Sequence, residues 1–167
     1  AKNSKLPTKF SENENLTWKT SIKGKAWSSP VVKDGYIWLT NADEDGHQMW
    51  ALKLDWQTGK IINELLVFQN KEPQFCHPMN SYATPTPIIE DGKVFVHFGS
   101  HGTAALDAQT GEKIWERRDF KCDHFRGAAA SPISHNGNII VHFDGHDYQY
   151  IVCVNQKNGK TLWKKER

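Results

Sequence analysis

The chain has 167 residues, of which 38% are hydrophobic and 24% charged, and its formal net charge is +2. This composition is typical of a globular domain with a packed core rather than of a disordered chain. A charge so close to neutral gives no reason to expect nucleic acid or an anionic membrane as partner, and without an apolar run of 18 residues we expect no transmembrane segment.

Residues 1–15 are rich in Lys, Asn, Ser and Glu and are predicted to form an extended lead-in. The next stretch, 16–22, contains Leu16-Thr-Trp18, which matches the ends of later strands. We therefore interpret 16–22 as the orphan outer strand of a unit whose earlier strands are missing. The chain opens without a methionine and shows no signal peptide, as a processed or truncated chain would.

Three units follow, over residues 28–68, 83–119 and 129–166. Each begins with a Ser-Pro or Thr-Pro pair and a short β-branched run. That run leads into a hairpin turn, at Asp34-Gly35, Asp91-Gly92 and Asn136-Gly137. Asp-Gly and Asn-Gly between apolar runs favour tight hairpins because both turn residues can adopt positive φ.

The strongest repeat is an eleven-residue phrase in which a strand, a turn and a second strand follow one another. It runs over Ala105–Trp115 and Cys153–Trp163, and a third copy over Lys53–Asn63 lacks the final tryptophan. The turn glycines of the copies lie 48–52 residues apart. Four strands in such a repeat are typical of a propeller blade; a β-sandwich is the alternative.

We thus predict an all-β fold, in which residues 16–167 form a partial β-propeller. It contains three four-stranded blades and the orphan outer strand, within a larger propeller of seven or eight blades. Three blades alone would leave long unpaired sheet edges, which natural sheets avoid. A fragment of a longer chain explains this best, and closure by self-association through the open edges is the other possibility.

The phrase with Ala105, Asp107, Thr110, Gly111 and Trp115 resembles the tryptophan-docking motif of propellers related to pyrroloquinoline-quinone (PQQ) dehydrogenases. The resemblance implies that each tryptophan packs between blades and that each turn glycine sits beside the indole of the next blade. The docking residues would be Trp18, Asp107, Gly111, Trp115, Gly159 and Trp163. Because Asn63 departs from the motif, we expect the contact around the first blade to be the loosest.

From about Leu16 onward, the chain resembles the amino-terminal portion of bacterial PQQ-binding-like propeller repeat proteins. These are relatives of an outer-membrane assembly lipoprotein with a propeller fold. The stretches Ala26–Pro30, Cys76–Tyr82 and His124–Gly127 are similar to this subgroup. The resemblance implies a periplasmic or secreted protein, and it alone suggests PQQ as a cofactor. The resemblance does not imply a particular biochemical activity.

Two long connections, 67–83 and 119–130, join successive blades and carry the candidate functional residues. In propellers such loops lie on one face, near the central channel. The candidates are Cys76, His77, Asn80, Tyr82, Cys122, His124 and Arg126. Three interpretations of the two Cys/His pairs stay open: a disulfide between Cys76 and Cys122, two free thiols, or a Cys/His metal site.

Single side chains in these segments also allow two interpretations. Arg126 could bind a carboxylate or phosphate bidentately, or hold carbonyl groups of its own loop. His97 and His142 recur at one strand position, which favours a packing role, and His101 is expected to be solvated on a turn.

Catalytic motifs are missing from the sequence: there are no adjacent cysteines, no G-x-S-x-G and no H-E-x-x-H. We therefore assign no catalytic residue and no metal ligand. The favoured function is a non-catalytic scaffold or interaction module, with a protein partner or the remaining blades of the propeller as its partner. The alternative is part of a PQQ-dependent dehydrogenase, or of a propeller enzyme that acts on polysaccharide.

Overall fold

The computed structural model describes residues 7–167 and contains three four-stranded antiparallel sheets, here called blades 1, 2 and 3. Blade 1 consists of β1 (Val31–Lys33), β2 (Tyr36–Ala42), β3 (Gln48–Asp55) and β4 (Ile61–Gln69). Blade 2 consists of β5 (Ile88–Glu90), β6 (Lys93–His97), β7 (Thr103–Asp107) and β8 (Lys113–Arg117). Blade 3 consists of β9 (Ile133–His135), β10 (Asn138–Asp144), β11 (Gln149–Asn155) and β12 (Thr161–Glu166). A single 3₁₀ turn, η1 (Gly99–His101), interrupts blade 2.

The predicted all-β fold of three four-stranded blades is confirmed, and the turn chemistry explains the register of the strands. Asp34, Asp91 and Asn136 have φ of 52°, 47° and 49°, and each is followed by a glycine that also has positive φ. Turns of this kind match the twist of the flanking strands. The first two strands of each blade therefore pair directly, as in the pairing of Lys33 with Tyr36.

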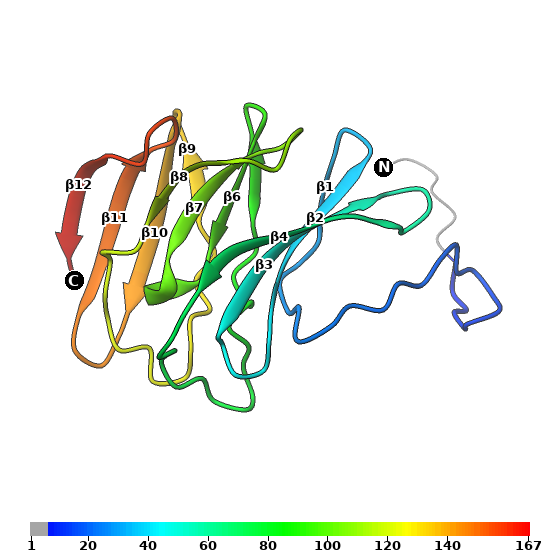
Figure 1. The fold of residues 1–167 in the computed structure, drawn as a ribbon, viewed down its shortest axis with the longest axis horizontal. Coiled ribbons are helices and arrows are strands. Elements are labelled where there is room, and N and C mark those ends of the chain that lie inside the picture. The colour runs from blue at the N-terminus through cyan, green and yellow to red at the C-terminus, as the bar shows by residue number, and fades with distance from the viewer. Residues whose placement is uncertain (1–6) are drawn as a thin grey trace.

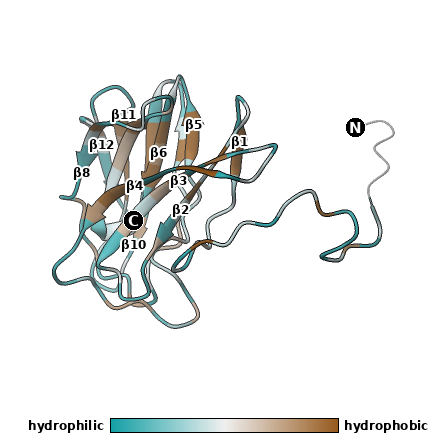
Figure 2. Cartoon of the chain, turned by 45° about the vertical axis from the view of Figure 1, so that its right-hand side comes forward, coloured by the Kyte–Doolittle hydropathy of each residue, from teal (hydrophilic) through white to brown (hydrophobic). Residues whose placement is uncertain are grey.

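The three blades lie side by side in chain order, and the strands of blade 1 are inclined to those of blade 3 (Figure 1). One apolar cluster joins blades 1 and 2, and it includes Trp38, Phe68 and Phe98. A second cluster joins blades 2 and 3, and it includes Phe95 and Phe143. The strands carry most of the hydrophobic colour, whereas the turns and the outer β12 are hydrophilic (Figure 2). Burial between the sheets therefore holds the blades together.

The docking contact between blades 2 and 3 depends on Trp115. Its Nε1–H donates to the carbonyl of Gln156 at 2.9 Å, and its ring covers Gly159, where an added β-carbon would lie 2.8 Å from the indole. The Arg117 guanidinium donates to the Gly159 carbonyl at 2.5 Å. Gly159 thus sits beside the indole of the preceding blade, not the next one as expected. The direction is set by the outer strand β8, whose indole points toward the blade that follows it in the chain.

Trp18 makes the same contact with blade 1. Its Nε1–H donates to the carbonyl of Trp56 at 3.1 Å, its ring lies against Gly59, and Thr20 Oγ1 donates to the Gly59 carbonyl at 2.6 Å. The expected outer strand over 16–22 is nevertheless not a strand. A strand needs a paired neighbour, and the described residues offer this segment none. The described part of the lead-in, 7–15, contains only an isolated bridge.

The junction between blades 1 and 2 lacks a tryptophan, because Asn63 occupies the docking position. Lys53, which pairs with Asn63 across the sheet, places its Nζ 2.8 Å from the carbonyl of Ala108. This carbonyl is equivalent to the one that Trp115 binds at the next junction. Leu65 covers Gly111, where an added β-carbon would lie 2.8 Å from its side chain. The expected looseness of this junction stays a prediction.

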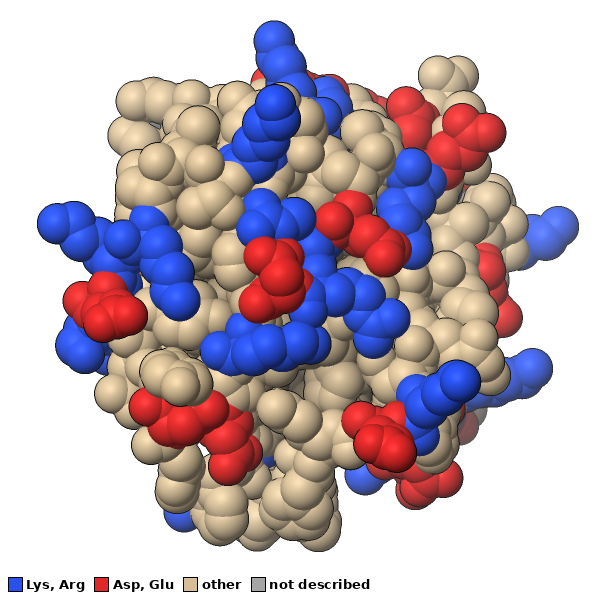
Figure 3. Space-filling model, turned by 60° about the vertical axis from the view of Figure 1, so that its left-hand side comes forward, with Lys and Arg blue, Asp and Glu red and all other residues tan. Residues whose placement is uncertain are grey.

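Trp163 ends the copy of the phrase in blade 3 and is 43% exposed, on the side of blade 3 that no other described blade covers. Ile133 and Leu162 are exposed as well. On the side turned forward in Figure 3, basic and acidic side chains are interspersed rather than gathered into a patch of one sign. Blade 3 therefore presents a mixed surface that includes an undocked indole.

The two indoles allow a matched test of docking. Trp115→Ala should lower the free energy of unfolding by at least about 2 kcal/mol, because it removes packed aromatic area and leaves the Gln156 carbonyl unpaired. Trp163→Ala in the same 167-residue chain should cost less than about 1 kcal/mol, since its ring is already exposed. Urea unfolding of both variants measures the difference, and equal losses would contradict the docking role of Trp115.

Candidate functional site

The candidate residues lie at the end of the sheets where two linkers cross from blade to blade. Linker 1 (residues 70–87) joins β4 to β5, and linker 2 (residues 118–132) joins β8 to β9. Figure 1 shows both linkers at the lower edge of the molecule, opposite the β1–β2, β5–β6 and β9–β10 hairpin turns. We call this end the loop face.

Tyr82 fixes the course of linker 1. Its hydroxyl donates to the carbonyl of Gln74 at 2.6 Å, which closes the linker into a compact loop. Its ring packs directly on Gly46, in the β2–β3 turn. It also lies edge-to-face with the His101 ring, with the two ring centroids 5.4 Å apart. Tyr82 therefore ties linker 1 to blades 1 and 2 and serves to position the loop.

His101 is not solvated as expected but lies beneath linker 1. Its Nε2 accepts from the backbone N–H of Gln74 at 3.1 Å, and its Nδ1 lies 3.2 Å from the Phe98 carbonyl. Burial lowers the pKa of His101 to about 4, so the ring is neutral near pH 7. This burial could not be predicted from the sequence, because the contact arises only when linker 1 folds over η1.

The two linkers meet at the backbone of Arg126. Asn80 Nδ2 donates to the Arg126 carbonyl at 2.8 Å, and the Cys76 sulfur lies 3.8 Å from the same oxygen. Gly127 has φ +88°, and an added β-carbon there would lie 2.6 Å from the Cys76 sulfur. Glycine is required at position 127, because a β-carbon would collide with the Cys76 sulfur and the positive φ disfavours other residues. Linker 1 thus holds the loop that carries Arg126 through contacts of Cys76 and Asn80.

Only one of the two predicted Cys/His pairs forms a side-chain contact. The Cys122 sulfur lies 3.2 Å from His124 Nε2, and both residues are buried. Burial raises the pKa of Cys122 to about 11 and lowers that of His124. The pair is therefore a neutral thiol beside a neutral imidazole, unlike the thiolate that a nucleophilic cysteine needs. The Cys76 sulfur contacts two backbone carbonyls, those of His77 at 3.9 Å and Arg126 at 3.8 Å, and not the His77 ring.

All three cysteines are free thiols in the structure. Of the three interpretations, the structure shows free thiols and no disulfide between Cys76 and Cys122. Within residues 7–167, no group of three or more His, Cys, Asp or Glu side chains is placed to hold a metal ion. The Cys122–His124 pair lacks the further ligands that a zinc site requires.

The outer surface of the loop face combines exposed apolar side chains with the basic side chain of Arg126. The exposed apolar residues are Phe75, Met79, Phe125 and Tyr148. Two hollows lie on either side of Arg126: one of about 490 Å³ beside His77 and Met79, and one of about 410 Å³ beside His124 and His146. Within residues 7–167, no carboxylate lies within ion-pair distance of the Arg126 guanidinium.

Sequence reasoning selected Arg126 but missed the four apolar residues around it. Phe75, Phe125 and Tyr148 lie in otherwise polar loops, and Met79 is 83% exposed. Apolar side chains within polar loops were the available signal. The ring of Phe125 lies 4.9 Å from that of His146, so the aromatic group is partly ordered by its neighbours.

The fold and its docking contacts define a PQQ-like propeller repeat protein. The family model described as outer membrane protein assembly factor BamB matches residues 9–167, and the chain belongs to that family. No curated protein matches the chain.

Solved structures show the same fold at low identity. A europium-containing methanol dehydrogenase has TM-score 0.64 and 17% identity, over 90% of this chain and 27% of its own. The quinohemoprotein alcohol dehydrogenase ADHIIG from Pseudomonas putida HK5 has TM-score 0.62 and 19% identity, over 89% and 22%. BamB from Moraxella catarrhalis has TM-score 0.59 and 16% identity, over 90% and 39%. The chain thus spans less than two fifths of each of these structures.

The residues present do not fit a quinone cofactor bound through calcium. Calcium takes six to eight oxygen ligands, several of them from carboxylates. The part of the chain that the structure describes gathers no such group, and Arg126 on the loop face has apolar neighbours. We derive no redox step from these residues. No helix among residues 7–167 is long and apolar enough to cross a membrane.

The state of the cysteines can be tested by counting thiols. In the native chain we expect slow reaction at Cys76 alone, because it is only half-buried, whereas Cys122 and Cys153 are 1% and 3% exposed. Unfolding should expose three reactive thiols with or without a reductant. Cys76→Ser should abolish the native reaction. A single thiol after unfolding without reductant would reveal a disulfide and contradict the structure.

Proposed function

We propose that this chain is a non-catalytic propeller repeat domain whose loop face holds a protein partner. The observation that carries the proposal is the set of exposed apolar residues on the loop face, of which Met79 and Phe125 line hollows beside Arg126. The Arg126 guanidinium has no carboxylate of residues 7–167 within ion-pair distance. Aromatic residues, Met and Arg are the side chains enriched at protein interfaces. The two linkers also hold this surface in place before a partner arrives, which lowers the entropic cost of binding.

A periplasmic or secreted location belongs to the same proposal. Its support is the family description, which names an outer membrane assembly factor. Such a factor works beside other proteins, which agrees with a domain that presents an interaction surface. The remaining blades of a longer propeller would complete the sheet edges while leaving the loop face free.

The rival proposal is an enzyme, either a quinoprotein dehydrogenase or a propeller that acts on polysaccharide. The structural likeness to alcohol dehydrogenases motivates it, but that likeness is to the fold alone. The neutral Cys122–His124 pair gives no nucleophile. Titration of the full-length protein with PQQ and calcium separates the proposals: saturable binding with dye-linked oxidation of an alcohol or sugar would overturn the scaffold.

Loop-face variants test partner binding directly. Protein fragments from the host of this chain would be displayed as a library, selected on the immobilised chain, and measured individually. Met79→Asp and Arg126→Glu should each weaken binding of the selected fragments by at least about tenfold. Both positions are exposed, so the fold should survive.

Lys157→Glu is the matched control, because Lys157 is exposed on a hairpin turn at the opposite end of blade 3. It should leave binding unchanged. Fragments that bind the control and both loop-face variants equally, or a library that yields no specific fragment, would contradict the proposal.

A further inference from the structure

The two junctions between blades use equivalent residues, and one of them is incompletely filled. In blade 3, Gln156 follows the turn residue Asn155, and its side chain crosses the junction to blade 2. There its Nε2–H donates to the carboxylate of Asp91 at 2.7 Å. Gln156 is 4% exposed, so its carboxamide fills the space between the two sheets.

At the junction between blades 1 and 2 the same positions hold Ala108 and Asp34. The equivalence follows from the backbone: Ala108 N–H donates to Gly92 as Gln156 N–H donates to Gly137. A methyl group cannot reach Asp34, whose carboxylate makes no hydrogen bond to another residue in 7–167. A cavity of about 450 Å³ remains between the blades.

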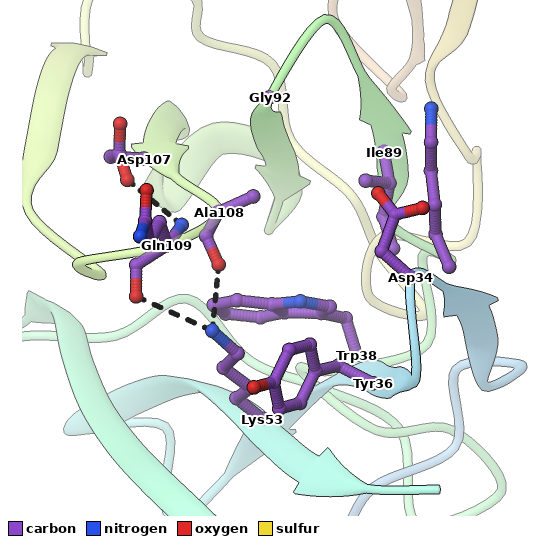
Figure 4. A pocket seen from close by; sticks show the side chains of 10 residues that line it. Asp34, Tyr36, Trp38, Lys53, Ile89, Gly92, Asp107, Ala108 and Gln109 are labelled. Atoms are coloured by element: carbon purple, nitrogen blue, oxygen red, sulfur yellow. Dashed lines mark hydrogen bonds between the residues drawn. The ribbon is translucent and has the colours of Figure 1, made fainter.

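The wall of this cavity opposite Ala108 is aromatic and basic (Figure 4). Tyr36 and Trp38 line it, and Lys53 Nζ lies 4.1 Å from the centre of the Tyr36 ring. Lys53 is 5% exposed and uses two of its three N–H donors, on the carbonyls of Ala108 at 2.8 Å and Gln109 at 3.3 Å.

Lys53 therefore has one N–H left for a ligand and no carboxylate within ion-pair distance in the described chain. Burial lowers its pKa, and Asp107 opposes that shift. Oδ1 of Asp107 accepts from the backbone N–H groups of Gln109 and Thr110, both at 2.8 Å. An anionic group beside Lys53 would thus complete its hydrogen bonds.

We propose that this cavity binds a small zwitterion of the amino-acid class. The ligand's ammonium pairs with Asp34, in place of the carboxamide that Gln156 supplies at the other junction. Its carboxylate accepts from Lys53, and its carbon chain lies against Tyr36 and Trp38. Charged groups of both signs line the cavity, Asp34 and Asp107 with Lys33 and Lys53, and this favours a zwitterion over a simple anion or cation.

The site stands apart from the loop face, since its lining comes from the β1–β2, β5–β6 and β7–β8 turns at the opposite end of the sheets. Partner binding and ligand binding can therefore fail separately. A cavity of this volume lies within the range of small-molecule sites.

The test uses the full chain and L-glutamine as the probe, because it is a small zwitterion whose side chain carries no charge of its own. Titration calorimetry and tryptophan fluorescence should show saturable binding, with Trp38 as a reporter in the wall. N-acetyl-L-glutamine, which lacks the ammonium, and L-glutaminamide, which lacks the carboxylate, should bind at least about tenfold more weakly. Equal binding of all three, or no saturable binding, overturns the proposal.

Two variants locate the site. Ala108→Gln should fill the cavity with the chain's own carboxamide, abolish glutamine binding and raise the melting temperature by about 2–4 °C. Asp34→Asn, which tolerates the positive φ of that turn, should weaken binding about tenfold without a change in fold. Gln156→Ala, at the other junction, is the control and should leave binding unchanged. Undiminished binding by Ala108→Gln, or loss of binding with Gln156→Ala alone, overturns the assignment.

Discussion

The structure depends on one hydrogen bond that is repeated at every blade junction. At each junction a side-chain donor binds the carbonyl of the residue that follows the turn Asp or Asn of the next blade. These carbonyls belong to Trp56, Ala108 and Gln156. Trp18 and Trp115 supply an indole N–H, and Lys53 supplies an ammonium where Asn63 replaces the tryptophan. Each donor reaches a carbonyl that the blade's own strands leave unpaired, and a buried unpaired carbonyl would be costly. The bond therefore sets the spacing and order of the blades.

Once the junctions fix the sheets, the connecting segments are free to vary. At one end the linkers fold over the sheets and present Arg126 among exposed apolar side chains. At the other end Ala108 stands where blade 3 has Gln156, and its small side chain leaves a cavity beside Lys53. Propellers separate these tasks naturally, because the strands carry the core and the loops carry recognition. Both proposed sites thus arise from departures from the repeat rather than from the repeat itself.

The sequence allowed the blades to be predicted because their signals are local. Asp34-Gly35 and its equivalents specify hairpins by backbone conformation, and the spacing of the turn glycines specifies the repeat. It could not show that Lys53 substitutes for an indole, since that contact needs the register of β3 against β4 and the position of the next blade. The burial of His101 and the joining of Asn80 to Arg126 were likewise hidden, because both arise between segments far apart in the chain.

The most direct test of this account exchanges the two kinds of junction donor. Lys53→Ala and Asn63→Trp should each lower the free energy of unfolding, the first by leaving the Ala108 carbonyl unpaired and the second by crowding Lys53. The double variant rebuilds the pairing of Ala105 with Trp115 seen in blade 2. Urea unfolding of the four proteins should show a favourable coupling of at least about 1 kcal/mol, with the double variant as stable as the parent chain. Strictly additive losses would contradict the claim that one carbonyl, reached by either donor, organises each junction.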